Sequence, residues 1–113
     1  MTHPRRDLDS LIHSPVRFSV LAALAHLESA DFRFLADLVE VSDSSLSQSL
    51  TALADADLVE IRKEAAGRRT RTWVRITDHG SEAFSQHVRT LQEIADTGAI
   101  EQPSRTPLKG DAS

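Results

Sequence analysis

From residue 14 onward the apolar positions follow a helical period. Ser14 followed by Pro15 predicts a helix start, because serine can cap the free N–H groups of a first turn and proline already has the helical φ. Apolar residues then recur three or four positions apart as far as Leu27. This spacing predicts a helix that ends near residues 28–30.

The segment ahead of this helix has a different character. Residues 1–6 are expected to form a flexible arm. Asp7 can cap a short helix that would present Leu8, Leu11 and Ile12 on one side. Such an apolar side needs a partner, from either the same chain or another one.

The period changes again after residue 30. Phe32 and Phe34 alternate as in a strand, so a brief extended segment is expected to lead into a second helix at about 33–40. Ser42 then predicts the N-cap of a third helix, at about 43–56. Two helices joined by so short a turn are typical of a helix-turn-helix unit.

The third helix is expected to have two different sides. Leu46, Leu50 and Leu53 fall within a sector of roughly 60°, which predicts that they face the core. The opposite side presents small polar groups and no large apolar one. Its residues are Ser44, Gln48, Thr51 and Asp55, flanked by Ser45 and Ala52, with Ser47 nearer the edge.

Two stretches of period-two alternation follow, at residues 58–63 and 70–76. They predict a β-hairpin whose loop is the Ala-Ala-Gly-Arg-Arg segment at 65–69. Thr77 or Asp78 can cap a last helix that runs to about residue 95. The apolar stripe of that helix comprises Phe84, Val88, Leu91 and Ala95, with His87 and Ile94 adjoining.

Residues 96–113 contain prolines and glycines and hardly any apolar residue, so we expect a disordered tail. The domain is therefore expected to span residues 7–95. Its order of elements predicts a mainly α fold with a small β-hairpin (α+β), that is, a winged helix-turn-helix domain.

Charge is distributed unevenly along the chain. The net charge of −4 argues against a nucleic-acid partner when it is taken alone. Residues 62–75, however, hold six basic residues and a single acid, so this segment carries +5 and the other 99 residues carry −9. An acidic body with one basic projection is typical of a protein that brings a local element to phosphates.

Composition excludes several classes of protein. The 113 residues suffice for one domain without a separate substrate lobe, and the absence of cysteine excludes disulfides and thiolate chemistry. No signal-type apolar run follows the first residues and no stretch approaches membrane-spanning length, so a cytoplasmic protein is expected. We find no catalytic motif and expect neither an enzyme nor a cofactor.

The residues also carry a family resemblance. The segments 31–35, 41–50 and 53–59 resemble the winged-helix core of bacterial transcriptional regulators, and 63–80 resembles their wing and the start of their dimerisation helix. The similarity is greatest to the small MarR/ArsR-type regulators that have a minimal domain, over about residues 8–95. Asp57 stands where such relatives often carry glycine, and aspartate tolerates left-handed backbone better than most residues.

The resemblance implies a DNA-binding homodimer, with helix 43–56 as the recognition helix in the major groove and hairpin 62–75 as the wing. The candidates for base contacts are Ser44, Ser45, Gln48 and Thr51. The candidates for contacts to the DNA backbone or the minor groove are Ser47, Arg62, Lys63, Arg68, Arg69 and Arg71.

We expect the terminal helices to form the dimer interface through Leu8, Leu11, Ile12, Phe84, Val88, Leu91 and Ile94. The predicted function is that of a sequence-specific regulator, most simply a repressor, on a pseudo-palindromic operator. Any small-molecule effector would have to sit in the dimer crevice, between the first and last helices.

Two other interpretations compete with this one. The five histidines do not show the spacing of a metal site within one chain, and no metal is expected. A winged helix that binds other proteins, without specific DNA binding, is the alternative function, because the body is acidic and the recognition helix carries no positive charge. The basic wing favours DNA.

Overall fold

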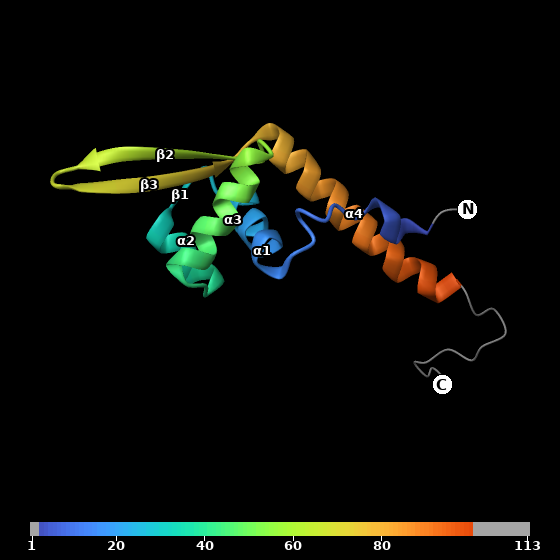
Figure 1. Ribbon diagram of the computed structural model, residues 1–113. Helices are drawn as coiled ribbons and strands as arrows, with labels where there is room; N and C mark the ends of the chain where they lie inside the picture. Colours follow the sequence, from blue (N-terminus) through green and yellow to red (C-terminus); the bar gives the residue numbers. More distant parts are fainter. Residues whose placement is uncertain (1–2, 101–113) are drawn as a thin grey trace.

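The computed structural model describes residues 3–100 and confirms the predicted fold (Figure 1). Four α-helices surround a small three-stranded antiparallel sheet, and two of its strands extend into a long hairpin. In chain order the elements are η1 (Pro4–Asp7), α1 (Pro15–Ala25), β1 (Ala30–Asp31), α2 (Phe32–Val39), α3 (Asp43–Asp55), β2 (Val59–Ala66), β3 (Arg69–Ile76) and α4 (Asp78–Ile100).

The three central helices hold the core. Leu21 and Leu24 of α1, Leu35 of α2, and Leu46 and Leu53 of α3 are all fully buried, and together with the inner side of the sheet they form one apolar cluster. Burying such side chains is the main force that holds three short helices together. The three leucines predicted to face inward from the third helix are buried, as expected.

Both predicted serine caps are present. The Ser14 hydroxyl accepts a hydrogen bond from the backbone N–H of Arg17 at 3.5 Å, and that of Ser42 accepts one from Ser45 at 3.1 Å. The first helix ends at Ala25, earlier than its apolar spacing predicted, because Leu27 already lies in the following loop with its side chain 36% exposed. Helix α2 begins at Phe32, so the alternating phenylalanines are helical.

The sheet contains one strand more than the predicted hairpin. Strand β1 pairs with β3 through Ala30 and Asp31, which gives the order β1-β3-β2. The hairpin is also longer than predicted, because Ala66 pairs directly with Arg69 and leaves a turn of two residues. Gly67 has φ +67°, as a two-residue hairpin turn with glycine at its first position requires. The predicted five-residue loop was therefore wrong.

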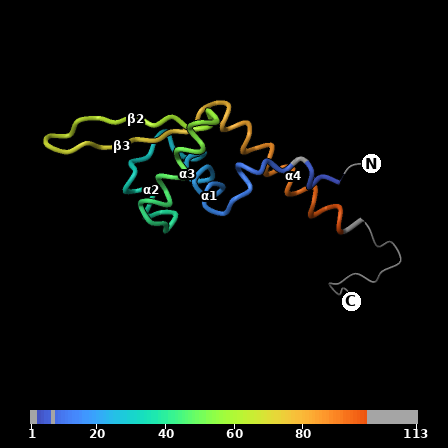
Figure 2. Tube along the Cα trace, viewed as in Figure 1, coloured from blue at the N-terminus to red at the C-terminus, as the bar shows by residue number. Residues whose placement is uncertain are grey.

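The N-terminal segment differs from its prediction. The short helix is η1, a 3-10 turn that begins at Pro4 and ends at Asp7, so Asp7 is not its cap. Proline suits this first position because it needs no N–H partner there, and His3 Nδ1 accepts the backbone N–H of Arg5 at 3.1 Å. Residues 4–6, which were expected in a flexible arm, thus form part of a helical turn beside α4 (Figure 2).

Helix α4 is long and only partly covered. Phe84 packs its ring at 5.2 Å from that of Phe18 on α1, and the further part of the helix lies beside η1. The helix continues to Ile100, beyond the boundary at residue 95 that the sequence predicted; residues 101–113 of the predicted tail lie outside the described part. None of the helices described over residues 3–100 combines the length and apolar character that a bilayer crossing demands.

The molecule is elongated, because the hairpin and α4 project from the helical body in different directions (Figure 1). Its extents are 67 × 30 × 23 Å, and its radius of gyration of 18.4 Å exceeds the roughly 13 Å of a compact domain of about 100 residues. Two elements therefore present surface that the chain itself does not cover.

His87 is the one buried histidine of the described residues. Its side chain is 2% exposed on the inner side of α4, and neither ring nitrogen has a hydrogen-bond partner among the described residues. The rings of His13 and Phe18 lie at 5.5 and 5.6 Å. Burial lowers the pKa of His87, the charge of His13 lowers it further, and the carboxylate of Asp9 opposes both effects.

We predict that acid destabilises the fold through His87. The unfolded chain takes up a proton on this residue near pH 6.5, whereas the folded chain resists it, so stability is complete above that pH and falls as the pH drops toward the lowered folded pKa. His87→Leu should remove this dependence. Urea unfolding at fixed protein concentration, at about pH 7.5 and about pH 5.5, measures the free energy of unfolding. Between the higher and the lower pH, this free energy should fall less for the variant than for the wild type.

His26→Leu is the matched control, because it also replaces a histidine by leucine, but at an exposed position at the end of α1. The prediction would be contradicted if wild type and His87→Leu differed in free energy of unfolding by the same amount at both pH values.

Candidate DNA interface

Helix α3 presents the polar side that the sequence predicted. Ser44, Ser47, Gln48 and Thr51 are exposed, whereas Ser45 is half-buried and its backbone N–H is committed to the Ser42 cap. Short hydroxyls and one amide leave the surface of the helix smooth enough to enter a major groove about 12 Å wide. The helix holds the groove candidates on one side, with Ser45 turned partly inward.

Ser49 belongs to the other side of this helix. It is 7% exposed and faces the core beside the buried leucines. A larger side chain at this position would have to displace core residues. The residue therefore has no access to a groove, and Gln48 alone carries the amide chemistry on the exposed side of α3.

The wing brings its basic residues to two faces. Paired residues of an antiparallel hairpin share a face, so Arg62, Arg69, Arg71 and Arg75 lie on one face together with Trp73. Lys63 pairs with Thr72 and lies on the other. Arg62 and Lys63, adjacent in the sequence, therefore cannot support the same contact. Arg68 stands in the turn, at the end of the hairpin.

Ion pairs divide the wing arginines into two groups. Arg62, Arg71 and Arg75 each have a carboxylate nearby, from Glu64 at 3.4 Å, Asp31 at 3.7 Å and Glu60 at 2.7 Å respectively. Arg71 also lies over the Trp73 ring at 5.4 Å. Among the residues described between 3 and 100, Arg68, Arg69 and Lys63 form no such pair, so they are the wing cations most available to phosphates.

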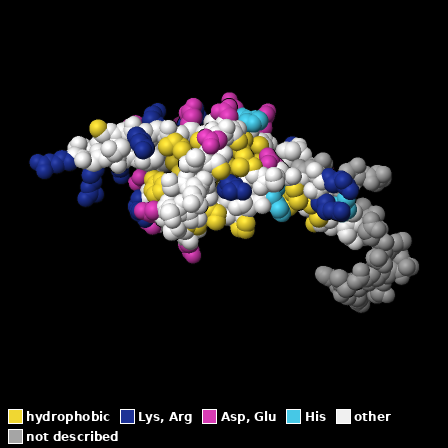
Figure 3. All heavy atoms as spheres, viewed as in Figure 1, with side chains coloured by type: hydrophobic (Ala, Val, Ile, Leu, Met, Phe, Trp, Pro, Cys, Tyr) yellow, Lys and Arg dark blue, Asp and Glu magenta, His cyan; other side chains and the backbone are white. Residues whose placement is uncertain are grey.

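A groove of about 570 Å³ separates the wing from the start of α2. Arg33 on α2 and Arg69 and Arg71 on β3 line it, with Asp31 as the acid among them. Figure 3 shows basic side chains along the hairpin and a second group toward the opposite end of the molecule, whereas acidic ones are spread over the helical body. The excess of positive charge predicted for this segment is thus placed at one end of the molecule.

Sequence patterns did not indicate the contact between Arg33 and Asp43. Arg33 Nη2 lies 2.7 Å from both carboxylate oxygens of Asp43, the first residue of α3, and this contact raises the pKa of Arg33. The two residues are ten positions apart, which matches no helical or strand spacing, so only the turn between α2 and α3 brings them together. Asp43 therefore does not present a free carboxylate beside the polar side of α3.

The predicted dimer residues separate into two sets. Ile12 is fully buried in the core of its own chain, so its assignment to a dimer interface was wrong: no surface of it is left for a partner. The others are half-buried, and Phe84 already contacts Phe18. The half-buried candidates besides Phe84 are Leu8, Leu11, Val88, Leu91 and Ile94.

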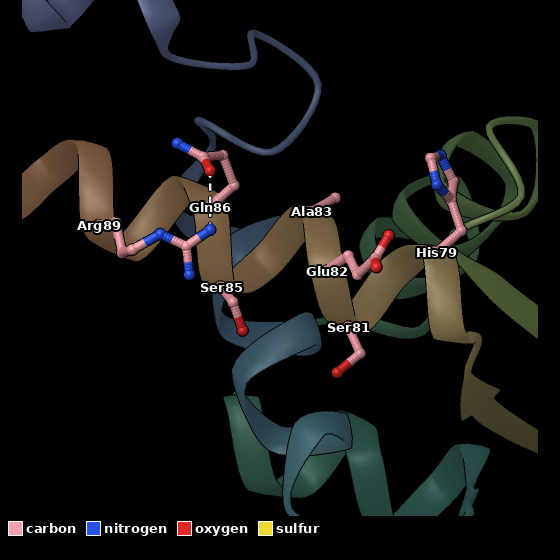
Figure 4. Close-up of a pocket in the computed structure, with 7 residues that line it drawn as sticks. All are labelled: His79, Ser81, Glu82, Ala83, Ser85, Gln86 and Arg89. Atoms are coloured by element: carbon pink, nitrogen blue, oxygen red, sulfur yellow. Dashed lines mark hydrogen bonds between the residues drawn. The ribbon is translucent and has the colours of Figure 1, made fainter.

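Helix α4 also borders a shallow groove of about 490 Å³ that contains none of the predicted site residues. Figure 4 shows its side chains spread along the helix, with Arg89 Nη2 donating to Gln86 Oε1 at 2.7 Å. His79 lines this groove and is exposed, whereas His87 on the same helix is buried. Over residues 3–100 no three side chains of the metal-binding types gather.

Comparison with known proteins agrees with this geometry. Residues 16–95 match the family model described as a winged helix DNA-binding domain. The chain belongs to this family. The match begins in α1 and ends within α4, so it includes α3, the turn before it and the whole wing.

Similar proteins come from several sources. An uncharacterized protein of Methanocaldococcus jannaschii, MJ0432, is 28% identical over 85 residues, which are 75% of this chain and 92% of that protein. The structure of a transcriptional regulator homologue from Pyrococcus horikoshii superposes with a TM-score of 0.80 at 23% identity, over 88% of this chain and all of the other. The structure of PcaV from Streptomyces coelicolor, solved with its natural ligand, superposes with a TM-score of 0.69 at 19% identity. The match covers 88% of this chain and 70% of PcaV. Both solved structures therefore share the fold of this chain.

The unpaired wing arginines lead to a prediction. Arg68→Ala combined with Arg69→Ala should weaken binding to duplex DNA about tenfold and lower the salt slope by roughly 0.9 for each phosphate that the wing no longer neutralises. Fluorescence anisotropy at several salt concentrations measures both quantities. The control is Arg75→Ala with Arg89→Ala, which removes the same charge from an ion-paired and a distant position. Equal effects of the two double variants would rule out a special role for the wing tip.

Proposed function

We propose that this protein is a transcriptional regulator that binds a specific double-stranded DNA sequence as a homodimer. Helix α3 enters the major groove, and the wing, residues 62–75, contacts the backbone or the minor groove. The observation that carries the proposal is the exposed polar side of α3 next to a hairpin with unpaired cations, within a winged helix DNA-binding domain. The chemistry is recognition, without an enzymatic activity of its own.

The polar side of α3 supports specificity. Gln48 can donate and accept at once, so its amide can make two hydrogen bonds to one adenine. Ser44 and Thr51 lie on the same side and can bond to neighbouring base edges. The cations of the wing supply the affinity that does not depend on sequence.

The uncovered part of α4 supports the homodimer. Val88, Leu91 and Ile94 recur along a helix that projects from the body, and each stays half-buried in the single chain. A two-fold axis through these residues would bury both copies of the stripe. It would also present two α3 helices to successive major grooves, 34–36 Å apart on the DNA. Repression by blocking polymerase is the simplest outcome.

We also propose that a small, mainly apolar molecule can modulate the regulator. A cavity of about 210 Å³ lies where α1 begins against α4, and its lining residues are His13, Ser14, Pro15, Phe18, His87 and Leu91. It touches the helix that carries the proposed dimer contacts, so an occupant could alter the packing of α4. PcaV, a structural neighbour, was solved with its natural ligand, which makes an effector a reasonable expectation.

Selection from a random duplex library tests specific recognition. The wild type should enrich a pseudo-palindrome with half-sites about one helical turn apart. Gln48→Ala should lose the preference at one position of each half-site, worth roughly 1–3 kcal/mol, while the salt slope stays the same. The control is Gln92→Ala, which removes an exposed glutamine from α4.

Uniform weakening by Gln48→Ala on all sequences would make this residue a backbone contact instead. Failure of the wild type to bind any duplex at low salt would favour the winged helix that binds proteins.

The dimer has its own test. Ile94→Asp should yield monomers in sedimentation velocity, because it places a charge in the apolar stripe at a position outside the cavity of the monomer. Gln92→Asp introduces a similar charge at an exposed position of the same helix and should leave the dimer intact. A dimer that survives Ile94→Asp would exclude this part of α4 as the interface.

A further inference from the structure

The end of α3 nearest to α2 is held by one arginine. Arg33 Nη2 reaches both oxygens of Asp43 at 2.7 Å, and its Nη1 lies 3.8 Å from Asp37, one helical turn further along α2. The first of these contacts has the short distances of a charge-assisted hydrogen bond. It spans the turn of the helix-turn-helix unit and joins its two helices.

Stability does not account for this pair. The side chains of Arg33 and Asp43 are 58% and 61% exposed, and ion pairs in contact with water contribute little to folding. The helix start is already satisfied, because Ser42 caps it. A carboxylate in the first turn is also favourable without a partner, since it meets the positive end of the helix dipole.

The place of the pair in the fold indicates another role. The N-terminal residues of a recognition helix are those that meet the DNA, and Asp43 is the first residue of α3. Helix α3 contains two acids and no basic residue, so nothing on the helix itself offsets that carboxylate against the phosphates. Among the residues described between 3 and 100, Arg33 is the cation that binds it.

We propose that Arg33 is a positioning residue for DNA binding: it holds the Asp43 carboxylate and cancels its negative charge at the end of α3 that approaches the DNA. This role rests on the proposed function of α3. A guanidinium has more N–H groups than Asp43 can accept, but the effect of Arg33 on affinity passes through that carboxylate. Loss of Arg33 leaves an uncompensated charge facing phosphates, whereas loss of both charges does not.

A double-mutant cycle tests this role on a labelled random-sequence duplex at low salt, by fluorescence anisotropy. Arg33→Ala should weaken binding about tenfold, and Asp43→Asn should match or exceed the wild type. In the Asp43→Asn background, Arg33→Ala should cost less than about twofold. Arg33→Lys keeps the charge without the two-oxygen geometry, so it should restore most of the affinity.

The controls separate the possible failures. Arg89→Ala removes the same charge from α4 and should change affinity far less than Arg33→Ala. Thermal unfolding should show the same midpoint for the wild type and Arg33→Ala; if Arg33→Ala fails to fold, Arg33→Gln takes its place in the cycle. The same weakening by Arg33→Ala in both backgrounds would overturn the inference and make Arg33 a direct phosphate contact, with a salt slope lower by about 1. Unchanged affinity in both backgrounds would overturn it as well.

A wild type that binds no duplex at all would instead contradict the proposed function, on which this inference depends. The two failures are therefore distinguishable in one set of titrations.

Discussion

The first turn of α4 packs directly on the start of the wing, and this contact places all the functional elements relative to one another. A Cβ atom at Gly80 would lie 2.0 Å from the carbonyl oxygen of Leu58, so no other residue fits there without moving the helix away from β2. Thr77 completes the junction: its hydroxyl donates to the carbonyl of Asp57 at 2.7 Å and accepts the N–H of Gly80 at 2.9 Å. Asp57, at φ +64°, directs the chain from α3 into β2. The end of α3, the base of the β2–β3 hairpin and the start of α4 thus meet within a few residues.

The distribution of charge over the surface also depends on how the elements are placed relative to one another. An acidic protein repels DNA on average, so its binding surface must separate cations from carboxylates. Here the separation is achieved by pairing, since Asp31 and Asp43 are each bound by an arginine near the groove between α2 and the wing. Two of the unpaired cations, Arg68 and Arg69, are at the far end of the hairpin, and the third, Lys63, lies midway along β2. The charge that matters for binding is therefore set by contacts between elements more than by composition.

The sequence predicted the helices and the two hairpin strands well because their signals are local. Ser14 and Ser42 are caps of the expected helices, and the leucines of α3 repeat with the helical period. What it missed depends on contacts between distant residues. The brief extended segment before the second helix was predicted, but its pairing with β3 was not, because two residues carry no signal for a distant partner. Ile12 has the same apolar character as an interface residue, and only the folded chain shows that it is buried. The salt bridge of Arg33 requires the turn between α2 and α3.

Helix α4 connects the two ends of the molecule, because its first turn is fixed on the wing and its further part lies against η1 and the cavity beside His87. Because α4 is held at both places, a change in packing at the cavity that moves the helix would shift it relative to the body. In a two-fold dimer, this movement changes the distance between the two α3 helices. DNA accepts only spacings near one helical turn, so a small change at this cavity would alter affinity for a paired site far more than the contacts of either copy alone. Protonation of His87 and occupation of the cavity would both act through this movement of α4.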